Sequence, residues 1–167
     1  KMESRYQRQL QLPEIGTAGQ KQIAQASVLV VGAGGLGCPA LQYLASSGVG
    51  CLGIIDPDTV EISNLARQIL YNESDLQKNK ALCARDKLKQ LNPSIDIEAY
   101  SFALDHTNAL SIIQKYDMVI DGSDNFSTRY LISDCCLLLH KPMIYGGLFK
   151  FEGQISVFNY QKGPSYR

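Results

Sequence analysis

The chain has 167 residues, 45% of them hydrophobic, and its 16 Lys and Arg residues balance its 16 Asp and Glu residues. This length allows one domain with a substantial core, and the balanced charge gives no support to a nucleic-acid or membrane partner. No apolar run reaches the roughly 20 residues of a membrane-spanning helix, and the first residues lack the apolar core of a secretory signal. We therefore expect a globular protein of the cytoplasm.

Cysteine usage points away from disulfides. The chain has five cysteines, an odd number, and none of them belongs to a CxxC pair. Buried free thiols are the ordinary interpretation of such a set. We therefore predict free thiols at Cys38, Cys51, Cys83, Cys135 and Cys136.

Helix and strand patterns alternate along the chain. In chain order we expect a helix at 12–26, a strand at 27–35, a helix at 36–48, a strand at 51–58, a helix at 80–92, a strand at 95–101, a helix at 108–116, a strand with a polar loop at 117–125, a helix at 126–141, and strands at 142–147 and 151–160. This alternation predicts an α/β fold, a doubly wound and mostly parallel sheet with helices on both faces. The short turn before the last strand allows that strand to run antiparallel. The irregular connection at 59–79 is of a kind that is usually functional.

A glycine-rich loop follows the first predicted strand. Gly32, Gly34 and Gly37 form GxGxxG between that strand and a helix, and Asp56 ends the second strand. Such glycines permit a tight turn, close approach of a phosphate and close helix–strand packing, while the acidic residue meets ribose hydroxyls. Taken alone, this pattern predicts NAD or FAD binding, and the alternative is a glycine turn without a ligand. Gly35 adds a fourth glycine, which gives a ligand room to lie deeper on the loop.

Two groups of polar residues follow the second strand. The segment SNLARQ places Ser63, Asn64, Arg67 and Gln68 beyond the carboxyl end of that strand, where open α/β folds bind ligands. Arg67 can bind a phosphate in two-pronged fashion, although a solvated turn is the alternative. Lys80 begins a helix, where its charge opposes the helix dipole unless a phosphate lies nearby. An ordinary surface lysine is the alternative at that position.

The segment DGSDN at 121–125 follows a buried strand. Its carboxylates beside a phosphate site predict Mg²⁺, which is bound by oxygen ligands, and Asp124 is the candidate ligand. Asp124 or Asn125 could also cap the next helix. A nicotinamide enzyme needs neither the cations nor this carboxylate. An enzyme that attacks the α-phosphate of ATP needs both, to stabilise developing charge and to hold the leaving pyrophosphate.

This ordered set of motifs resembles the MoeB/ThiF family of adenylyltransferases, relatives of the ubiquitin-activating enzymes. The matching segments span nearly the whole chain: RYQRQ (5–9), VLVVGAGGLGCPALQYLASSGVG (28–50), DPDTVEISNLARQ (56–68), Lys80, DGSDN (121–125) and FEGQISVFNY (151–160). The resemblance implies a Rossmann-like fold and ATP- and Mg²⁺-dependent adenylation of the C-terminal Gly-Gly carboxylate of a ubiquitin-like sulfur carrier protein, with release of pyrophosphate. The activated carrier would serve molybdopterin, thiamine or related thiolation pathways.

The resemblance also implies roles for individual residues. Asp56 would contact the ribose, Asp124 would hold Mg²⁺, and Asn125 would lie beside the nucleotide. The phosphates would contact Asn64, Arg67, Gln68 and Lys80. The full nucleotide-binding set is Gly32, Gly34, Gly35, Gly37, Asp56, Ser63, Asn64, Arg67, Gln68, Lys80, Asp124 and Asn125.

The resemblance gives the N-terminal segment a role as well. Arg8 looks like the arginine that family dimers place in the partner's ATP site, so it would act in trans within a homodimer, and the alternative is a surface charge. The catalytic set is then Arg8, Arg67, Lys80 and Asp124. The implied organisation is a helical arm at 1–26, an adenylation domain at 27–160 and the start of a truncated segment at 161–167.

The end of the chain departs from the family pattern. Many relatives bind a structural zinc through two CxxC pairs, the first within CYRC, whereas this chain has SYR and carries Ser165 at the first cysteine position. Serine is not a soft zinc ligand, so zinc of that type is not expected. The sequence does not say whether a thioester or persulfide step follows adenylation. The alternative functions are an NAD-dependent or flavin oxidoreductase, a non-catalytic scaffold of the same fold, and activation of a carboxylate on modified tRNA.

Overall fold

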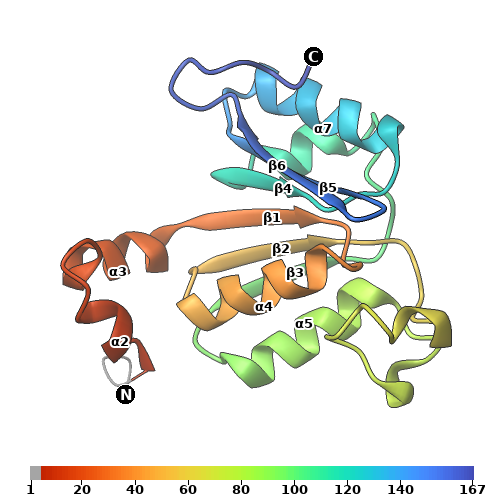
Figure 1. Cartoon of the computed structure of the whole chain (residues 1–167), viewed down its shortest axis with the longest axis horizontal. Coiled ribbons are helices and arrows are strands. Elements are labelled where there is room, and N and C mark those ends of the chain that lie inside the picture. The colour runs from red at the N-terminus through yellow and green to blue at the C-terminus, as the bar shows by residue number, and fades with distance from the viewer. Residues whose placement is uncertain (1–4) are drawn as a thin grey trace.

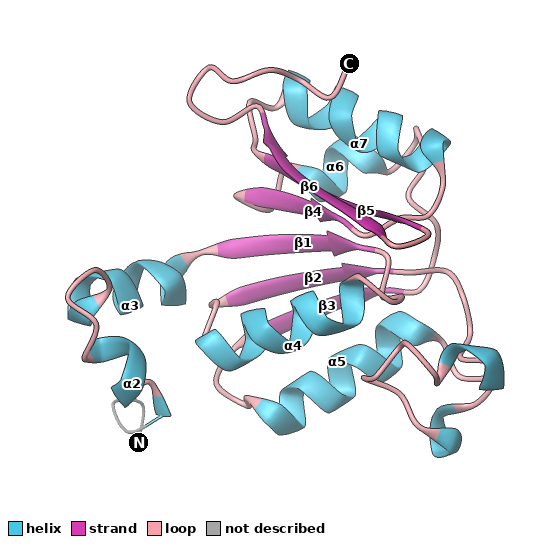
Figure 2. Cartoon of the chain, viewed as in Figure 1, coloured by secondary structure: helices cyan, strands magenta, loops and turns pink. Residues whose placement is uncertain are grey.

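In the computed structural model, which describes residues 5–167, six strands form one sheet in the order β3-β2-β1-β4-β5-β6. The strands are β1 (Ser27–Val31), β2 (Cys51–Ile55), β3 (Asp96–Tyr100), β4 (Met118–Asp121), β5 (Met143–Phe149) and β6 (Glu152–Phe158). Neighbours from β3 to β5 pair in parallel, and β6 pairs with β5 antiparallel. The predicted sheet is therefore confirmed, including its antiparallel last strand (Figure 2).

Helices cover both faces of the sheet, as Figure 1 shows. The pair α4 (Gly37–Ser47) and α5 (Lys80–Leu91) lies on one face, and the pair α6 (Ala109–Ile113) and α7 (Phe126–Leu138) lies on the other. Alternate residues of β1 serve the two cores because strand side chains point to opposite faces. Val28 and Val30 pack in the core below α4 and α5, while Leu29 and Val31 pack in the core below α6 and α7.

The helix expected at 12–26 is present as α3 (Gly16–Gln25), which begins later than expected. Pro13 explains the later start, because a proline disfavours helical geometry at the residue before it. A separate short helix, α2 (Gln7–Leu10), lies before that range. Helix α3 lies at the amino end of β1, and α2 lies below α3 in Figure 1. Residues 1–4 of the predicted arm lie outside the described residues.

A buried tyrosine fastens the N-terminal segment to the domain. The Tyr6 ring is buried against Gly48, and its hydroxyl accepts a hydrogen bond of 2.8 Å from the Asn92 side chain. Asn92 is itself fully buried and also donates to the carbonyl of Ala45 at 2.8 Å. The N-terminal segment is therefore held by packing and by hydrogen bonds.

The connection at 59–79 is irregular, as predicted. It contains two short 3-10 helices, η1 (Ile62–Asn64) and η2 (Glu73–Asp75). Its buried Tyr71 hydroxyl lies 2.9 Å from the carbonyl oxygen of Ala33. The connection is thus held against the glycine loop, although it has little regular structure of its own. None of the helices in residues 5–167 is long and apolar enough to cross a membrane.

All five cysteines are free thiols, as predicted. Burial raises the pKa of the Cys38 thiol to about 11 and that of Cys136 to about 12. Burial also raises the pKa values of Cys51, Cys83 and Cys135. The thiolate is the reactive form of cysteine, so these thiols are poor nucleophiles at neutral pH.

The thiols are therefore expected to react slowly. Iodoacetamide at pH 7.5 should leave Cys38 and Cys136 of the native protein unmodified, because almost none of either thiol is ionised and both are buried. Mass spectrometry after timed alkylation measures this, with protein unfolded in urea as the positive control. Rapid modification of Cys38 in the native protein would contradict the burial described here.

Candidate functional site

A cavity of about 1490 Å³ opens at the carboxyl end of the sheet. It lies at the point where the strand order reverses between β1 and β4, the usual place for a ligand in an open α/β sheet. Most of the predicted site residues line it: Gly32, Gly34, Gly35, Asp56, Asn64, Arg67, Gln68, Lys80, Asp124 and Asn125. Segments from both halves of the chain therefore meet in this cavity.

The glycines of the loop divide into two kinds. Gly32 has a φ of +90°, and a Cβ there would lie 2.7 Å from the carbonyl oxygen of Gly122. A Cβ on Gly37 would lie 1.9 Å from the carbonyl oxygen of Gly32. In contrast, a Cβ on Gly34 or Gly35 would meet only side-chain atoms, at 3.6 and 3.7 Å. The first two glycines are needed for folding, whereas the other two leave space that a ligand could fill.

Asp56 joins the end of β2 to the glycine loop. Its Oδ2 accepts a hydrogen bond of 2.7 Å from the backbone N–H of Ala33, and its Oδ1 accepts one of 2.9 Å from Asp58. Burial raises the pKa of the Asp56 carboxyl above its usual value, although both hydrogen bonds oppose this change. Asp56 thus shapes the loop, and its predicted contact with a ribose stays a prediction.

Lys80 begins α5 and is paired within the protein. Its Nζ lies 3.0 Å from Oδ2 of Asp58, and the two side chains are 7% and 64% exposed. The negative charge of Asp58 offsets the unfavourable interaction between Lys80 and the helix dipole. The position of Lys80 at the start of a helix therefore does not by itself require a phosphate. Because Asp58 is largely hydrated, Lys80 can exchange this partner for a phosphate at little cost.

The segment after η1 brings two further donors to the cavity. Arg67 is exposed, and its Nη1 donates to the carbonyl of Ser63 at 3.1 Å. Gln68 is only 3% exposed, and its buried Oε1 has no hydrogen-bond partner among residues 5–167. A buried polar atom without a partner is costly. The unpartnered Oε1 can only accept a hydrogen bond, so a ligand hydroxyl could satisfy it and a phosphate could not. The Nε2 of Gln68 lies 3.6 Å from the position of a Cβ on Gly34, so Gln68 and Arg67 can both donate to a nucleotide phosphate on the open glycines Gly34 and Gly35.

The loop at 121–125 has one carboxylate available for a metal. Asp121 is 1% exposed and forms an ion pair of 2.9 Å with Nε of Arg129. Asn125 caps α7 by accepting a hydrogen bond of 2.9 Å from the N–H of Thr128, as one alternative predicted. Asp124 is exposed at the cavity and takes part in none of the ion pairs found among residues 5–167. Asp124 therefore fits the role of metal ligand better than Asp121.

Three or more His, Cys, Asp or Glu side chains do not come together as a metal site anywhere in the described part of the chain. Mg²⁺ commonly uses one or two protein carboxylates and completes its shell with waters and substrate phosphates. Asp124 and a nucleotide could supply such a set between them.

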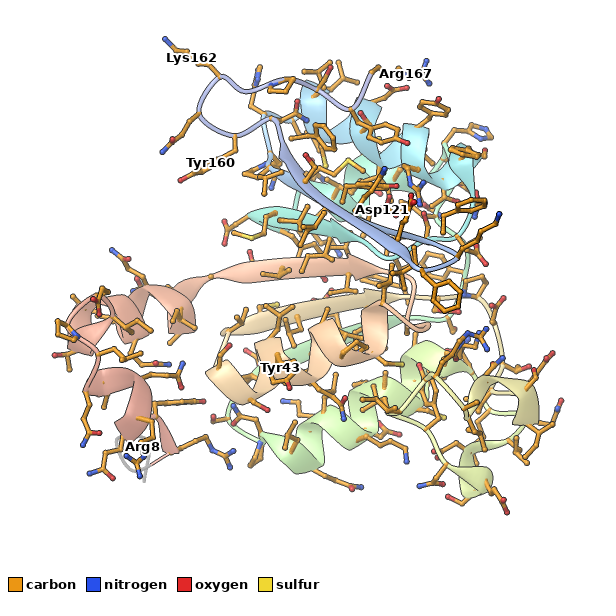
Figure 3. All side chains as sticks on the ribbon, in the orientation of Figure 1. Arg8, Tyr43, Asp121, Tyr160, Lys162 and Arg167 are labelled. Carbon is orange, nitrogen blue, oxygen red and sulfur yellow. The ribbon has the colours of Figure 1, made fainter. Side chains whose placement is uncertain are left out.

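Three predicted residues lie outside the lining of this cavity within residues 5–167. Gly37 acts in packing, and the side chain of Ser63 is exposed, with its Oγ 3.5 Å from the Glu61 carboxylate. Arg8 is on α2, beside the amino end of the sheet, whereas Asp121 marks the carboxyl end (Figure 3). Arg8 therefore cannot reach the cavity of its own chain in this structure.

The sequence profile of the ThiF family matches residues 6–167. The chain belongs to the ThiF family. It is 52% identical over 164 residues to a probable molybdopterin-synthase adenylyltransferase of Porphyra purpurea, covering 98% of this chain and 43% of that protein. It is 49% identical over 168 residues to a sulfur carrier protein adenylyltransferase of Thermus thermophilus, covering 98% of this chain and 62% of that protein. The chain thus spans less than two thirds of the length of either relative.

Solved structures share the fold of this ThiF-family chain. A crystal structure of PaaA matches with a TM-score of 0.85 and 27% identity, covering 99% of this chain and 54% of PaaA. The crystal structure of Escherichia coli MccB with AMPCPP and MccA matches with a TM-score of 0.84 and 25% identity, covering 97% of this chain and 50% of MccB. The Rossmann-like prediction is therefore confirmed.

Several cavity residues of the ThiF-family chain are missing from the predicted site. They include Arg129 of α7, Tyr145 of β5 and Leu104, which follows β3. Their positions depend on how distant segments pack, so no local spacing indicates them. The last residues of the chain also pack against the domain. The centroids of the Tyr166 and Tyr145 rings are 5.5 Å apart, and Nε of Arg167 lies 3.2 Å from Oδ1 of Asp134 in α7.

Proposed function

We propose that this chain adenylates the C-terminal Gly-Gly carboxylate of a ubiquitin-like sulfur carrier protein, using ATP and Mg²⁺ and releasing pyrophosphate. The observation that carries the proposal is the cavity: open glycines, the side-chain N–H groups of Gln68, the cations Arg67 and Lys80, and the available carboxylate of Asp124 all line one space. Relatives with 49% and 52% identity are named adenylyltransferases, which supports the same reaction class.

The residues would act by positioning and electrostatics. The carrier's carboxylate oxygen attacks the α-phosphorus of ATP, and the bond from that phosphorus to the bridging oxygen of the β-phosphate breaks. Arg67 and Lys80 would balance the negative charge that develops on the phosphates. Asp124 would hold Mg²⁺, which supplies further positive charge for the leaving pyrophosphate. The carrier supplies the nucleophile, so the high thiol pKa values found above do not conflict with this chemistry.

The cavity has room for two substrates. Its volume of about 1490 Å³ exceeds the roughly 300–1,000 Å³ of an ordinary small-molecule site. The lining also includes Gly146 and Gly147 of β5, which carry no side chains, and Gly146 faces Leu36 of the glycine loop. An extended peptide end of small residues suits this part of the lining. The MccB structure contains both AMPCPP and MccA, which supports a shared site for a nucleotide and a second molecule.

The position of Arg8 supports the proposal of a homodimer. Arg8 lies at the opposite end of the sheet from its own cavity (Figure 3), so a role in catalysis requires the site of a partner copy. We propose that it stabilises phosphate charge in trans. The carrier's identity, its molybdopterin, thiamine or related pathway, and a cytoplasmic location remain parts of the same proposal.

Carrier-dependent exchange of labelled pyrophosphate into ATP tests the function. We expect exchange with Mg²⁺ and a Gly-Gly-ending carrier, and a loss of about 100-fold or more in Asp124→Ala. The matched control is Asp86→Ala, which removes a carboxylate on α5 outside the cavity. ATP binding without exchange would favour the scaffold alternative, and preferential binding of NADH would favour the oxidoreductase.

A further inference from the structure

Arg129 connects three parts of the site. It lies in the first turns of α7, is 9% exposed and lines the cavity. Its Nε donates to Oδ2 of Asp121 at 2.9 Å, and its Nη2 donates to the carbonyl of Ser123 at 3.0 Å. Its guanidinium also lies over the Tyr145 ring, 4.6 Å from the centroid. One side chain thus joins the end of β4, the following loop and β5.

These contacts fix both sides of Asp124. On the strand side, Oδ1 of Asp121 accepts hydrogen bonds from the N–H and the Oγ of Ser123, at 2.9 and 2.6 Å. On the helix side, Asn125 is held by its cap on α7, and the N–H of Arg129 donates to the Asn125 carbonyl at 3.3 Å. Asp124 lies between these anchored residues, yet its own carboxylate has no ion-pair partner in residues 5–167.

The chemistry of this network favours a role beyond stability. A buried ion pair contributes little net stability compared with apolar residues of similar size, because both charges must lose water. The guanidinium holds two acceptors in a fixed planar arrangement, which a lysine ammonium does not reproduce. A planar guanidinium that binds both Asp121 at the strand end and Ser123 in the loop is suited to fixing the position of Asp124, the next residue.

We propose that Arg129 is a positioning residue that sets the loop at 121–125 so that Asp124 presents its carboxylate to the metal–nucleotide complex. This rests on the proposed function. Arg129 acts through Asp121 and Ser123, and it is not a ligand of the metal. Residues that orient a metal ligand typically matter by about 10- to 100-fold in metal affinity or activity.

The test is the affinity for ATP, measured by titration calorimetry with Mg²⁺ and with EDTA. Wild type is expected to bind ATP more tightly with Mg²⁺. Arg129→Lys should lose about 10-fold or more of affinity in Mg²⁺, with affinity in EDTA within about twofold of wild type. Hydrogen exchange at 121–125 should become faster in this variant. Arg85→Lys, which changes an arginine paired with its neighbour Asp86 outside the cavity, is the control.

The outcomes separate the two proposals. The positioning role is overturned if Mg²⁺ increases the affinity for ATP equally in wild type and in folded Arg129→Lys. It is also overturned if Arg129→Lys loses the same affinity for ATP in Mg²⁺ and in EDTA, because that would indicate a direct contact with the nucleotide. If Arg129→Lys does not fold, Asp121→Asn makes the same test, because it weakens the ion pair with Arg129 and keeps the arginine. A wild-type protein that binds no ATP in either condition overturns the proposed function itself, and this inference with it.

Discussion

Replacing Lys80 with methionine is expected to lower carrier-dependent pyrophosphate exchange by about 100- to 1000-fold while the protein stays folded. Lys80 is buried at the cavity, and its loss would remove one of the cations proposed to balance the developing phosphate charge. Methionine preserves the packing of the unbranched stem. The abandoned partner, Asp58, has a 64% exposed side chain, so it stays hydrated and stability should change by only about 1 kcal/mol or less.

The measurement pairs exchange rates with urea unfolding. Lys21→Met, which changes an exposed lysine of α3, is the matched control and should behave as wild type in exchange. Near-normal exchange in Lys80→Met would show that Lys80 is only the structural partner of Asp58.

Gly37→Ala is expected to lower the stability of the fold, whereas Gly35→Ala is expected to lower the affinity for ATP. A Cβ on Gly37 would lie 1.9 Å from a backbone oxygen of Gly32, so the backbone itself would have to shift to accept it. Gly37→Ala should therefore destabilise the fold by about 3 kcal/mol or more, or prevent folding. A Cβ on Gly35 would meet only the flexible Arg67 side chain at 3.7 Å, so Gly35→Ala should fold normally.

Gly35→Ala should instead weaken ATP binding by at least about tenfold, or ~1.4 kcal/mol, because its methyl group occupies the space offered to the phosphates. Thermal unfolding and ATP titration of both variants measure the contrast. Each variant is the control for the other. A stable Gly37→Ala protein, or a Gly35→Ala protein with wild-type ATP affinity, would contradict this division of the glycine loop.

The parts of the fold that follow local rules could be predicted from the sequence. The strand–loop–helix at Gly32 to Gly37 and the start of a helix at Lys80 depend on neighbouring residues only, and both are present. The helix expected at 12–26 is also present, as α3, but the prediction overlooked the local rule by which Pro13 delays its start to Gly16. The N-terminal segment was otherwise unpredictable because Tyr6 is placed by contact with Gly48 and Asn92, far along the chain.

The parts of the site that depend on distant contacts could not be predicted. Asp58 and Lys80 are 22 positions apart, and their pairing arises only when the connection at 59–79 folds back. Asp121 and Arg129 are only eight positions apart, yet they lie on a strand and a helix whose packing fixes the contact. The polar motif DGSDN indicated a metal site with Asp124 as the candidate ligand, but nothing in the motif indicated that Asp121 forms an ion pair with Arg129.

The most direct test of the account is the mass of the carrier protein after it is mixed with the purified protein, ATP and Mg²⁺. The account predicts a carrier that carries AMP on its C-terminal carboxylate, formed together with pyrophosphate and absent when Asp124 is replaced by alanine. A carrier of unchanged mass, with ATP converted to ADP and phosphate, would contradict it, because the attack would then have occurred at the γ-phosphate and not at the α-phosphate.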